Sequence, residues 1–186
     1  LTPFRFKLAP RIAGKSGKID QSKSKEKLIE EVQNHVIVAG FGLNGSNLAR
    51  VLKETGIKYV VTELNPDTVK REKAKGEKII YGDISKEEIL KAINVDKASI
   101  IVYAISDPAV TRMSLQLVKK INPHIYTLVR TRYVTEVDEL IKLGADDVIP
   151  EEFETALQIF RKVLERYHIP LNVIMKQTTL LREESY

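Results

Sequence analysis

The chain has 186 residues, of which 43% are hydrophobic and 30% are charged, and it contains neither Cys nor Trp. This length predicts one well-packed domain with a short appendage, and the lack of Cys excludes disulfides, thiol catalysis and Cys-based metal sites. No apolar run approaches the roughly 20 residues of a membrane-spanning helix, so we expect this polypeptide to be soluble.

The net charge of +5 is concentrated near the N-terminus. Residues 1–34 contain eight Lys or Arg against four Asp or Glu, a net +4, whereas residues 35–186 contain 22 against 21, a net +1. Because nucleic-acid binding needs a basic patch on the folded body, we predict a basic linker at 1–34 and no nucleic-acid partner. A nucleic-acid-binding function would rest on the overall charge alone.

Short β-branched runs alternate with amphipathic stretches over residues 35–149. This alternation predicts parallel strands joined by helices, with six strands at 35–39, 58–62, 78–81, 99–104, 125–129 and 147–149. Right-handed crossovers between such strands give a Rossmann-like doubly wound α/β sheet with strand order 3-2-1-4-5-6.

The residues after the sixth strand predict a long crossover helix over 151–166. Its apolar side chains form a stripe wide enough to face a partner subunit as well as its own sheet. The stripe consists of Phe153, Ala156, Leu157, Phe160, Val163, Leu164 and Tyr167.

The stretch AGFGLNGS contains a Gly-x-Gly-x-x-Gly motif at Gly40, Gly42 and Gly45. It follows the first predicted strand and opens a helix, and Glu63 ends the second strand at a spacing typical of nucleotide-binding Rossmann sheets. Gly40 would permit the tight turn, Gly42 would let a phosphate approach the backbone, and Gly45 would allow close helix packing. Glu63 would accept hydrogen bonds from a ribose 2′-hydroxyl, and its charge disfavours NADP.

Two aspartates follow later strands, and each has two interpretations. Asp83 in YGDIS is either a turn residue ahead of a capping box formed by Ser85 and Glu88, or a contact to adenine. Asp107 in AISDP is either a crevice residue or a helix cap, and the following Pro favours the cap.

Arg130 and Arg132, in VRTRY after the fifth strand, are either surface charges or clamps for phosphate and carboxylate groups. Their position at the carboxyl edge of the sheet favours the clamp.

A catalytic set is missing. The three histidines, His35, His124 and His168, lie away from the predicted crevice, and no Tyr-x-x-x-Lys pair or substrate domain is present. We therefore assign no catalytic and no metal-ligating residue. A nucleotide pocket without substrate machinery indicates sensing, and a stand-alone NAD-dependent oxidoreductase is the alternative.

Six segments agree in order with a known family: HVIVAGFGLNGSNLARVL, VVTELNP, IIYGDIS, IIVYAISDP, TLVRTRY and LGADDVIPEEFETA. Over residues 35–167 the chain resembles the RCK or KTN (TrkA-N) domain, a nucleotide-binding regulatory domain of potassium transport. The resemblance implies cofactor contacts at Gly40, Phe41, Gly42, Leu43, Asn44, Gly45, Glu63, Leu64, Asn65, Asp83, Ile84, Ala104, Asp107 and Arg130.

The ligand implied by this resemblance is NAD(H), AMP or ATP. Asp83 would face adenine and Arg130 would lie near the phosphates. Glu63 stands where many members have Asp, and Asn65 replaces a second acid, so the choice among these ligands stays open.

The opening LTPFRFKLAPRIAG is similar to the stretch after the last membrane helix of Kef-type potassium/proton antiporters of the cation:proton antiporter-2 group. The resemblance implies a transmembrane antiporter or channel domain in the same full-length chain, at the cytoplasmic face of the membrane. It also implies a homodimer through the 151–166 helix, and a tail at 168–186 that leads towards a further regulatory domain. Nucleotide binding would then bias the transporter by changing the dimer arrangement.

Overall fold

The computed structural model describes residues 33–185, so nearly all of the linker predicted at 1–34 lies outside the described residues. Six parallel strands form one sheet in the order β3-β2-β1-β4-β5-β6, which confirms the predicted topology. The strands are β1 (Val36–Ala39), β2 (Tyr59–Glu63), β3 (Ile79–Tyr81), β4 (Ile100–Tyr103), β5 (Tyr126–Thr131) and β6 (Asp147–Pro150).

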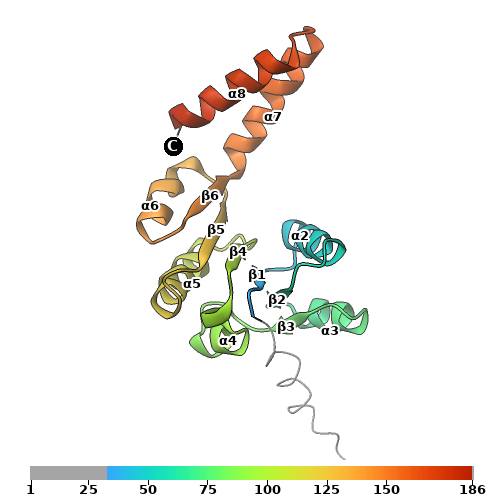
Figure 1. Cartoon of the computed structure of the whole chain (residues 1–186), viewed down its shortest axis with the longest axis vertical. Coiled ribbons are helices and arrows are strands. Elements are labelled where there is room, and N and C mark those ends of the chain that lie inside the picture. The colour runs from blue at the N-terminus through green and yellow to red at the C-terminus, as the bar shows by residue number, and fades with distance from the viewer. Residues whose placement is uncertain (1–32, 186) are drawn as a thin grey trace, which may run out of the picture.

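Helices cover the two faces of the sheet unequally (Figure 1). On one face, α2 (Leu43–Glu54) and α3 (Pro66–Ala74) pack over β1 to β3. On the other face lie α4 (Glu87–Ala92), α5 (Pro108–Ile121) and α6 (Val137–Lys142). Right-handed crossovers from β1 to β2 and from β2 to β3 place their helices on one face. The chain then returns to the centre of the sheet and adds β4, β5 and β6 in the opposite direction, which places the later helices on the other face.

Among residues 33–185, the helices between strands leave one half of a sheet face, formed by β4, β5 and β6, uncovered. All four residues of β1 are buried, but β5 alternates, with Val129 in the core and Leu128 and Arg130 only half-buried. The accessible side chains of β4, β5 and β6 therefore form what we call the open face. It comprises Ile100, Val102, Tyr126, Leu128, Arg130, Asp147 and Ile149.

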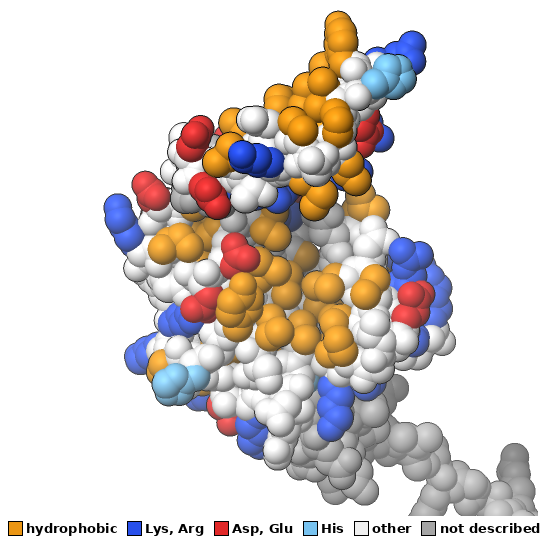
Figure 2. All heavy atoms as spheres, turned by 45° about the horizontal axis from the view of Figure 1, so that its top comes forward, with side chains coloured by type: hydrophobic (Ala, Val, Ile, Leu, Met, Phe, Trp, Pro, Cys, Tyr) orange, Lys and Arg blue, Asp and Glu red, His pale blue; other side chains and the backbone are white. Residues whose placement is uncertain are grey.

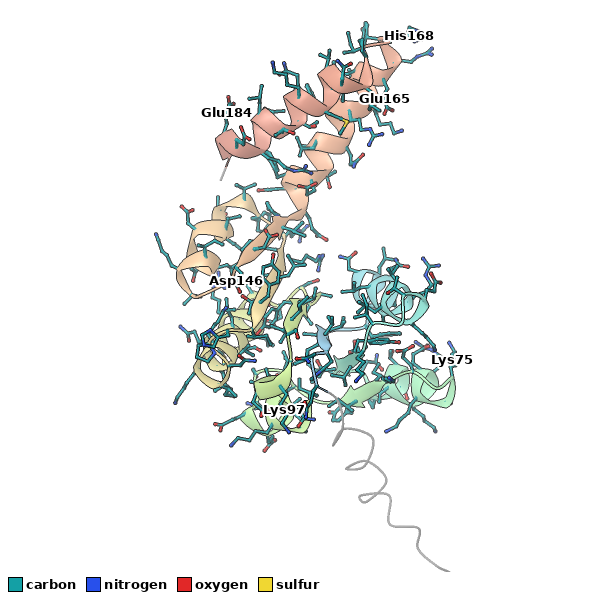
Figure 3. All side chains as sticks on the ribbon, viewed as in Figure 1. Lys75, Lys97, Asp146, Glu165, His168 and Glu184 are labelled. Carbon is teal, nitrogen blue, oxygen red and sulfur yellow. The ribbon has the colours of Figure 1, made fainter. Side chains whose placement is uncertain are left out.

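The predicted long helix is present as α7 (Glu151–Arg166), and the predicted tail contains α8 (Leu171–Ser185). The chain reverses at His168, which has φ 56°, and α8 packs back against α7. Ile174 of α8 is buried, and Arg182 pairs with Glu154 of α7 at 2.7 Å. The two helices form a hairpin that projects from the body, with His168 at its far end (Figures 1 and 3).

No helix in the described range 33–185 is long and apolar enough to cross a membrane.

His35 is fully buried at the amino end of β1, opposite the Gly-rich loop. Its Nε2 donates to the Ile93 carbonyl at 2.9 Å, and burial lowers its pKa despite this bond. A neutral imidazole so far from the crevice has a structural role, as the sequence indicates.

Candidate nucleotide-binding site

The Gly-rich loop joins β1 to α2, and its three glycines differ in their surroundings. Gly40 has φ +97°, which side chains disfavour, so the tight turn expected there is confirmed. A Cβ added to Gly45 would lie 1.9 Å from the Gly40 carbonyl oxygen, which confirms the expected close packing of α2. A Cβ added to Gly42 would meet no atom within 4 Å. The loop is therefore open to a ligand at Gly42 and closed at the other two positions.

The first turn of α2 presents to this opening backbone donors that the helix itself does not satisfy. The helix begins at Leu43, and Gly42 at its N-cap supplies no side-chain acceptor. The first N–H groups of such a helix lack intrahelical partners and carry the positive end of the helix dipole. An anion beside Gly42 would be stabilised by both effects.

Glu63 ends β2 beside the loop. Its Oε2 accepts from the Phe41 N–H and its Oε1 from the Asn65 N–H, both at 2.8 Å. An ionised carboxylate offers about four acceptor positions, so both oxygens can still accept from ribose hydroxyls. Glu63 thus fixes the backbone of the loop and keeps acceptor positions free for a ligand beside it.

Asp83 follows β3 and forms a turn. Its Oδ1 accepts from the Ser85 N–H at 2.9 Å and from the Ser85 hydroxyl at 2.8 Å. Burial alone would raise the pKa of Asp83, but the bonds from Ser85 and the nearby Lys86 outweigh it and lower the pKa. The predicted capping box of Ser85 and Glu88 is wrong, because Lys86 is the N-cap of α4 and Asp83 binds the Ser85 hydroxyl.

Asp107 caps α5, because its Oδ1 accepts from the Ala109 and Val110 N–H groups at 2.9 and 3.0 Å. The cap interpretation is thereby confirmed. Asn65 likewise caps α3.

The apolar residues predicted to contact the cofactor differ in their exposure. Leu43 and Leu64 are 78% and 52% exposed, whereas Ile84 is buried in the core. Ile84 could therefore meet a ligand only through its backbone.

Arg130 lies on the other side of the loop, near the first turns of α2 and α7. Its Nε donates to Glu151 and its Nη1 to the Ser106 hydroxyl at 2.8 Å. Asn44 Nδ2 donates to the same Glu151 carboxylate at 3.5 Å. Sequence reasoning did not assign Glu151 or Ser106 to the site, although both follow strands at the carboxyl edge.

A cleft of about 640 Å³ adjoins this group. Its lining includes Asn44 and Leu48 of α2, together with Ala104, Arg130 and Glu151, and its floor is the part of the open face that contains Val102, Leu128 and Ile149. Arg132 is not part of this lining within the described chain; it is exposed and lies 5.5 Å over the Tyr133 ring, which favours the surface-charge interpretation.

The strand order places the predicted site residues in two groups about β1. Glu63 ends β2 and Asp83 follows β3 on one side, and Ala104 and Arg130 belong to the β4 and β5 side. Ligands of doubly wound sheets bind at this reversal of strand order. The two groups therefore lie on opposite sides of β1 at the carboxyl edge of the sheet, and the Gly-rich loop follows β1 between them.

The TrkA-N domain family model matches residues 36–151. The glutathione-regulated potassium-efflux system protein KefC of Escherichia coli O17:K52:H18 (strain UMN026 / ExPEC) is 34% identical over 152 residues, or 80% of this chain and 24% of that protein. KefC of Cronobacter sakazakii (strain ATCC BAA-894) is 33% identical over 168 residues, or 90% and 27%. This chain spans about a quarter of the length of these relatives.

Solved structures share the fold. The TrkA-N domain of the inner membrane protein ybaL from Escherichia coli is 27% identical, with a TM-score of 0.67 over 73% of this chain and 97% of that one. The Shewanella denitrificans Kef CTD in its AMP-bound form has a TM-score of 0.70 at 22% identity, over 81% and 92%. The GsuK channel bound to NAD has a TM-score of 0.60 at 21% identity, over 74% and 23%.

Proposed function

Because this chain belongs to the TrkA-N domain family, we propose that it is a nucleotide-binding domain that regulates a potassium or cation/proton transporter of the Kef type. The observation that carries this proposal is the open loop at Gly42, with the first-turn N–H groups of α2 on one side and the Glu63 carboxylate on the other. The domain is a regulatory module and not an enzyme, so the oxidoreductase alternative is set aside.

The ligand class we propose is an adenine nucleotide that crosses the end of β1. The ribose would bind Glu63, the adenine would lie towards Asp83, and the phosphates would meet Gly42 and the first turn of α2. The AMP in the Kef CTD and the NAD in GsuK, proteins of the same fold, support this class. A 2′-phosphate beside Glu63 would add a like charge, so NADP is disfavoured.

The charges around the crevice favour ligands with few phosphates. Arg130 is the single basic residue among those that line the cleft in the described part of the chain, and Glu151 lies against it. We therefore propose AMP or NAD(H) in preference to ATP, which carries more negative charge than these side chains can offset.

Titration calorimetry and thermal unfolding of the purified chain with AMP, NADH, ATP and NADPH test this function. A ligand that binds only the folded state at 100 times its Kd stabilises it by about 2.7 kcal/mol, which for a chain of this size raises Tm by roughly 5–10 °C. We expect this for AMP or NADH and a much smaller effect for NADPH. No stabilisation by any adenine nucleotide would contradict the proposal.

The relatives support placing the domain at the cytoplasmic face of the membrane, joined to a transmembrane antiporter or channel domain. The basic composition of residues 1–34 fits a position beside an anionic membrane surface.

The open face supports the homodimer that we propose through α7. Ile149 is 41% exposed on the open face, and Ile159, Val163 and Tyr167 of α7 are 61%, 50% and 76% exposed. Figure 2 shows hydrophobic side chains gathered on the body below the hairpin and along the hairpin itself. A two-fold arrangement in which α7 of each copy covers apolar surface of the other would bury both patches.

We expect Ile149→Glu to convert the dimer to a monomer, because the substitution places a charge in the apolar interface. Ile141→Glu is the matched control, since Ile141 is 45% exposed but lies on α6, on the opposite face of the sheet. Sedimentation velocity of the two variants and the parent measures the effect. A monomeric parent, or equal dissociation in both variants, would refute this interface.

A further inference from the structure

Polar contacts at the first turn of α7 join this helix to the body, through Glu151 and Glu152, and to α8, through Glu154. Among the 16 residues of α7 only Leu157 is buried, and Phe153 and Phe160 are half-buried, so polar contacts act beside a limited apolar contact. Three acidic side chains of this turn bind three different parts of the molecule. Glu152 accepts from the Val134 N–H at 2.8 Å, Glu154 pairs with α8, and Glu151 reaches the crevice. The direction of α7 therefore depends in part on a contact that lies where a ligand would bind.

Glu151 carries a negative charge into the crevice. Its Oε1 accepts from Arg130 Nε and, at 3.5 Å, from Asn44 Nδ2. The bond from Arg130 is the main reason that the pKa of Glu151 lies below its ordinary value, so the carboxylate is ionised at neutral pH. The Arg130 and Glu151 side chains are 24% and 38% exposed. A dissolved anion can therefore reach both.

Asn44 and Arg130 are also side-chain donors on the side of the proposed phosphate position that faces the cleft. Asn44 stands in the first turn of α2, directly after the open loop, and Arg130 lines the adjoining cleft. We propose that Glu151 is an internal competitor of the nucleotide: its carboxylate occupies these donors until a phosphate displaces it and releases the first turn of α7. This inference rests on the proposed nucleotide binding.

The competition follows from charge. A phosphate and a carboxylate that share one guanidinium repel each other, so binding of the phosphate weakens the hold on Glu151. By linkage, the contact of Glu151 with Arg130 must lower nucleotide affinity by the same factor. The nucleotide would thus move α7, and with it the surface proposed for dimer formation, through a single residue.

Glu151→Gln tests this competition, because it removes the charge and keeps the shape. We expect AMP or NADH, whichever binds the parent chain, to bind this variant about fivefold to tenfold more tightly. Glu152→Gln is the control: it removes an equal charge from the same helix turn, yet Glu152 contacts the Val134 amide and not Arg130. We expect less than a twofold change for it, measured by titration calorimetry.

Spin labels report the movement of α7 independently of affinity. The chain has no Cys, so Lys70→Cys on α3 and Lys162→Cys on α7 allow two labels, and dilution with unlabelled chain isolates distances within one copy. We expect saturating nucleotide to shift the label distance in the parent. Glu151→Gln should show the shifted distance without any nucleotide.

Three outcomes overturn the inference. Unchanged or weaker nucleotide binding by Glu151→Gln would show that Glu151 does not compete, and equal tightening by Glu152→Gln would reveal a general charge effect. An unshifted label distance would show that α7 is not released. Each leaves the proposed function standing, whereas a parent chain that binds no nucleotide overturns both.

Discussion

Replacing Gly45 by alanine is expected to destabilise the domain, whereas Gly42→Asp is expected to leave it folded and abolish nucleotide binding. The added Cβ at position 45 would overlap the Gly40 carbonyl oxygen, since only 1.9 Å separates them. Neither atom belongs to a flexible side chain, so the backbone itself must shift, at a cost of about 3 kcal/mol. For a chain of this length, Tm should fall by about 6–12 °C.

Gly42 is different because it has open space and an ordinary φ of −68°. An aspartate is a favoured N-cap residue, so the change should keep or slightly raise Tm. Its carboxylate would occupy the proposed phosphate position and weaken nucleotide binding by on the order of 100-fold, or about 2.7 kcal/mol.

Gly42→Asn is the matched control for Gly42→Asp, since it has the same shape and no charge. Thermal unfolding with and without AMP or NADH separates the effects. We expect Gly42→Asn to retain more affinity than Gly42→Asp. Full nucleotide stabilisation of Gly42→Asp would rule out the proposed phosphate position, and an unchanged Tm in Gly45→Ala would show that the loop backbone adapts freely.

Asp146→Ala should lower the free energy of unfolding by about 2–3 kcal/mol, because it removes three hydrogen bonds at once. Asp146 Oδ2 accepts from Lys119 Nζ at 2.8 Å, from the Thr127 N–H at 2.7 Å and from the Thr127 hydroxyl at 2.8 Å. These bonds join α5, β5 and the entry to β6, and Thr127 is fully buried. Urea unfolding of the variant and the parent at neutral pH measures the loss.

The Asp146 contacts also predict a pH dependence. Burial would raise the pKa of Asp146, but the bonds from Lys119 and Thr127 outweigh it and lower the pKa below that of the unfolded chain. The stabilisation is thus complete above the unfolded pKa of about 4 and is lost as the pH falls through the lower folded value. The difference in the free energy of unfolding between Asp146→Ala and the parent should therefore shrink on acidification. A difference independent of pH would mean that the charge of Asp146 contributes nothing.

The fold could be predicted because its signals are local. Buried strands such as VIVA, and glycines with positive φ at the helix ends, mark each element within a few residues. Right-handed crossovers then leave few possible strand orders. The roles of Gly40 and Gly45 were predictable for the same reason, since both depend on a turn of six residues.

The capping box at Ser85 and Glu88 shows where local signals fail. The sequence allows Ser85 to cap the helix, with Glu88 as its partner, or to bind Asp83. In the structure Asp83 accepts from the Ser85 N–H and hydroxyl, and the helix begins after Lys86. Both arrangements suit the sequence, and only their relative energies in the folded chain decide between them.

The sequence by itself determined the sheet, its strand order and the Gly-rich loop with Glu63 beside it, since hydrophobic periodicity and turn chemistry act over short distances. The tertiary structure alone decided that residues 33–185 leave half of one sheet face uncovered and that Arg130 binds Glu151, 21 residues further along the chain. A charged side chain can pair with any opposite charge within reach, and only the assembled carboxyl edge of the sheet decides which one that is.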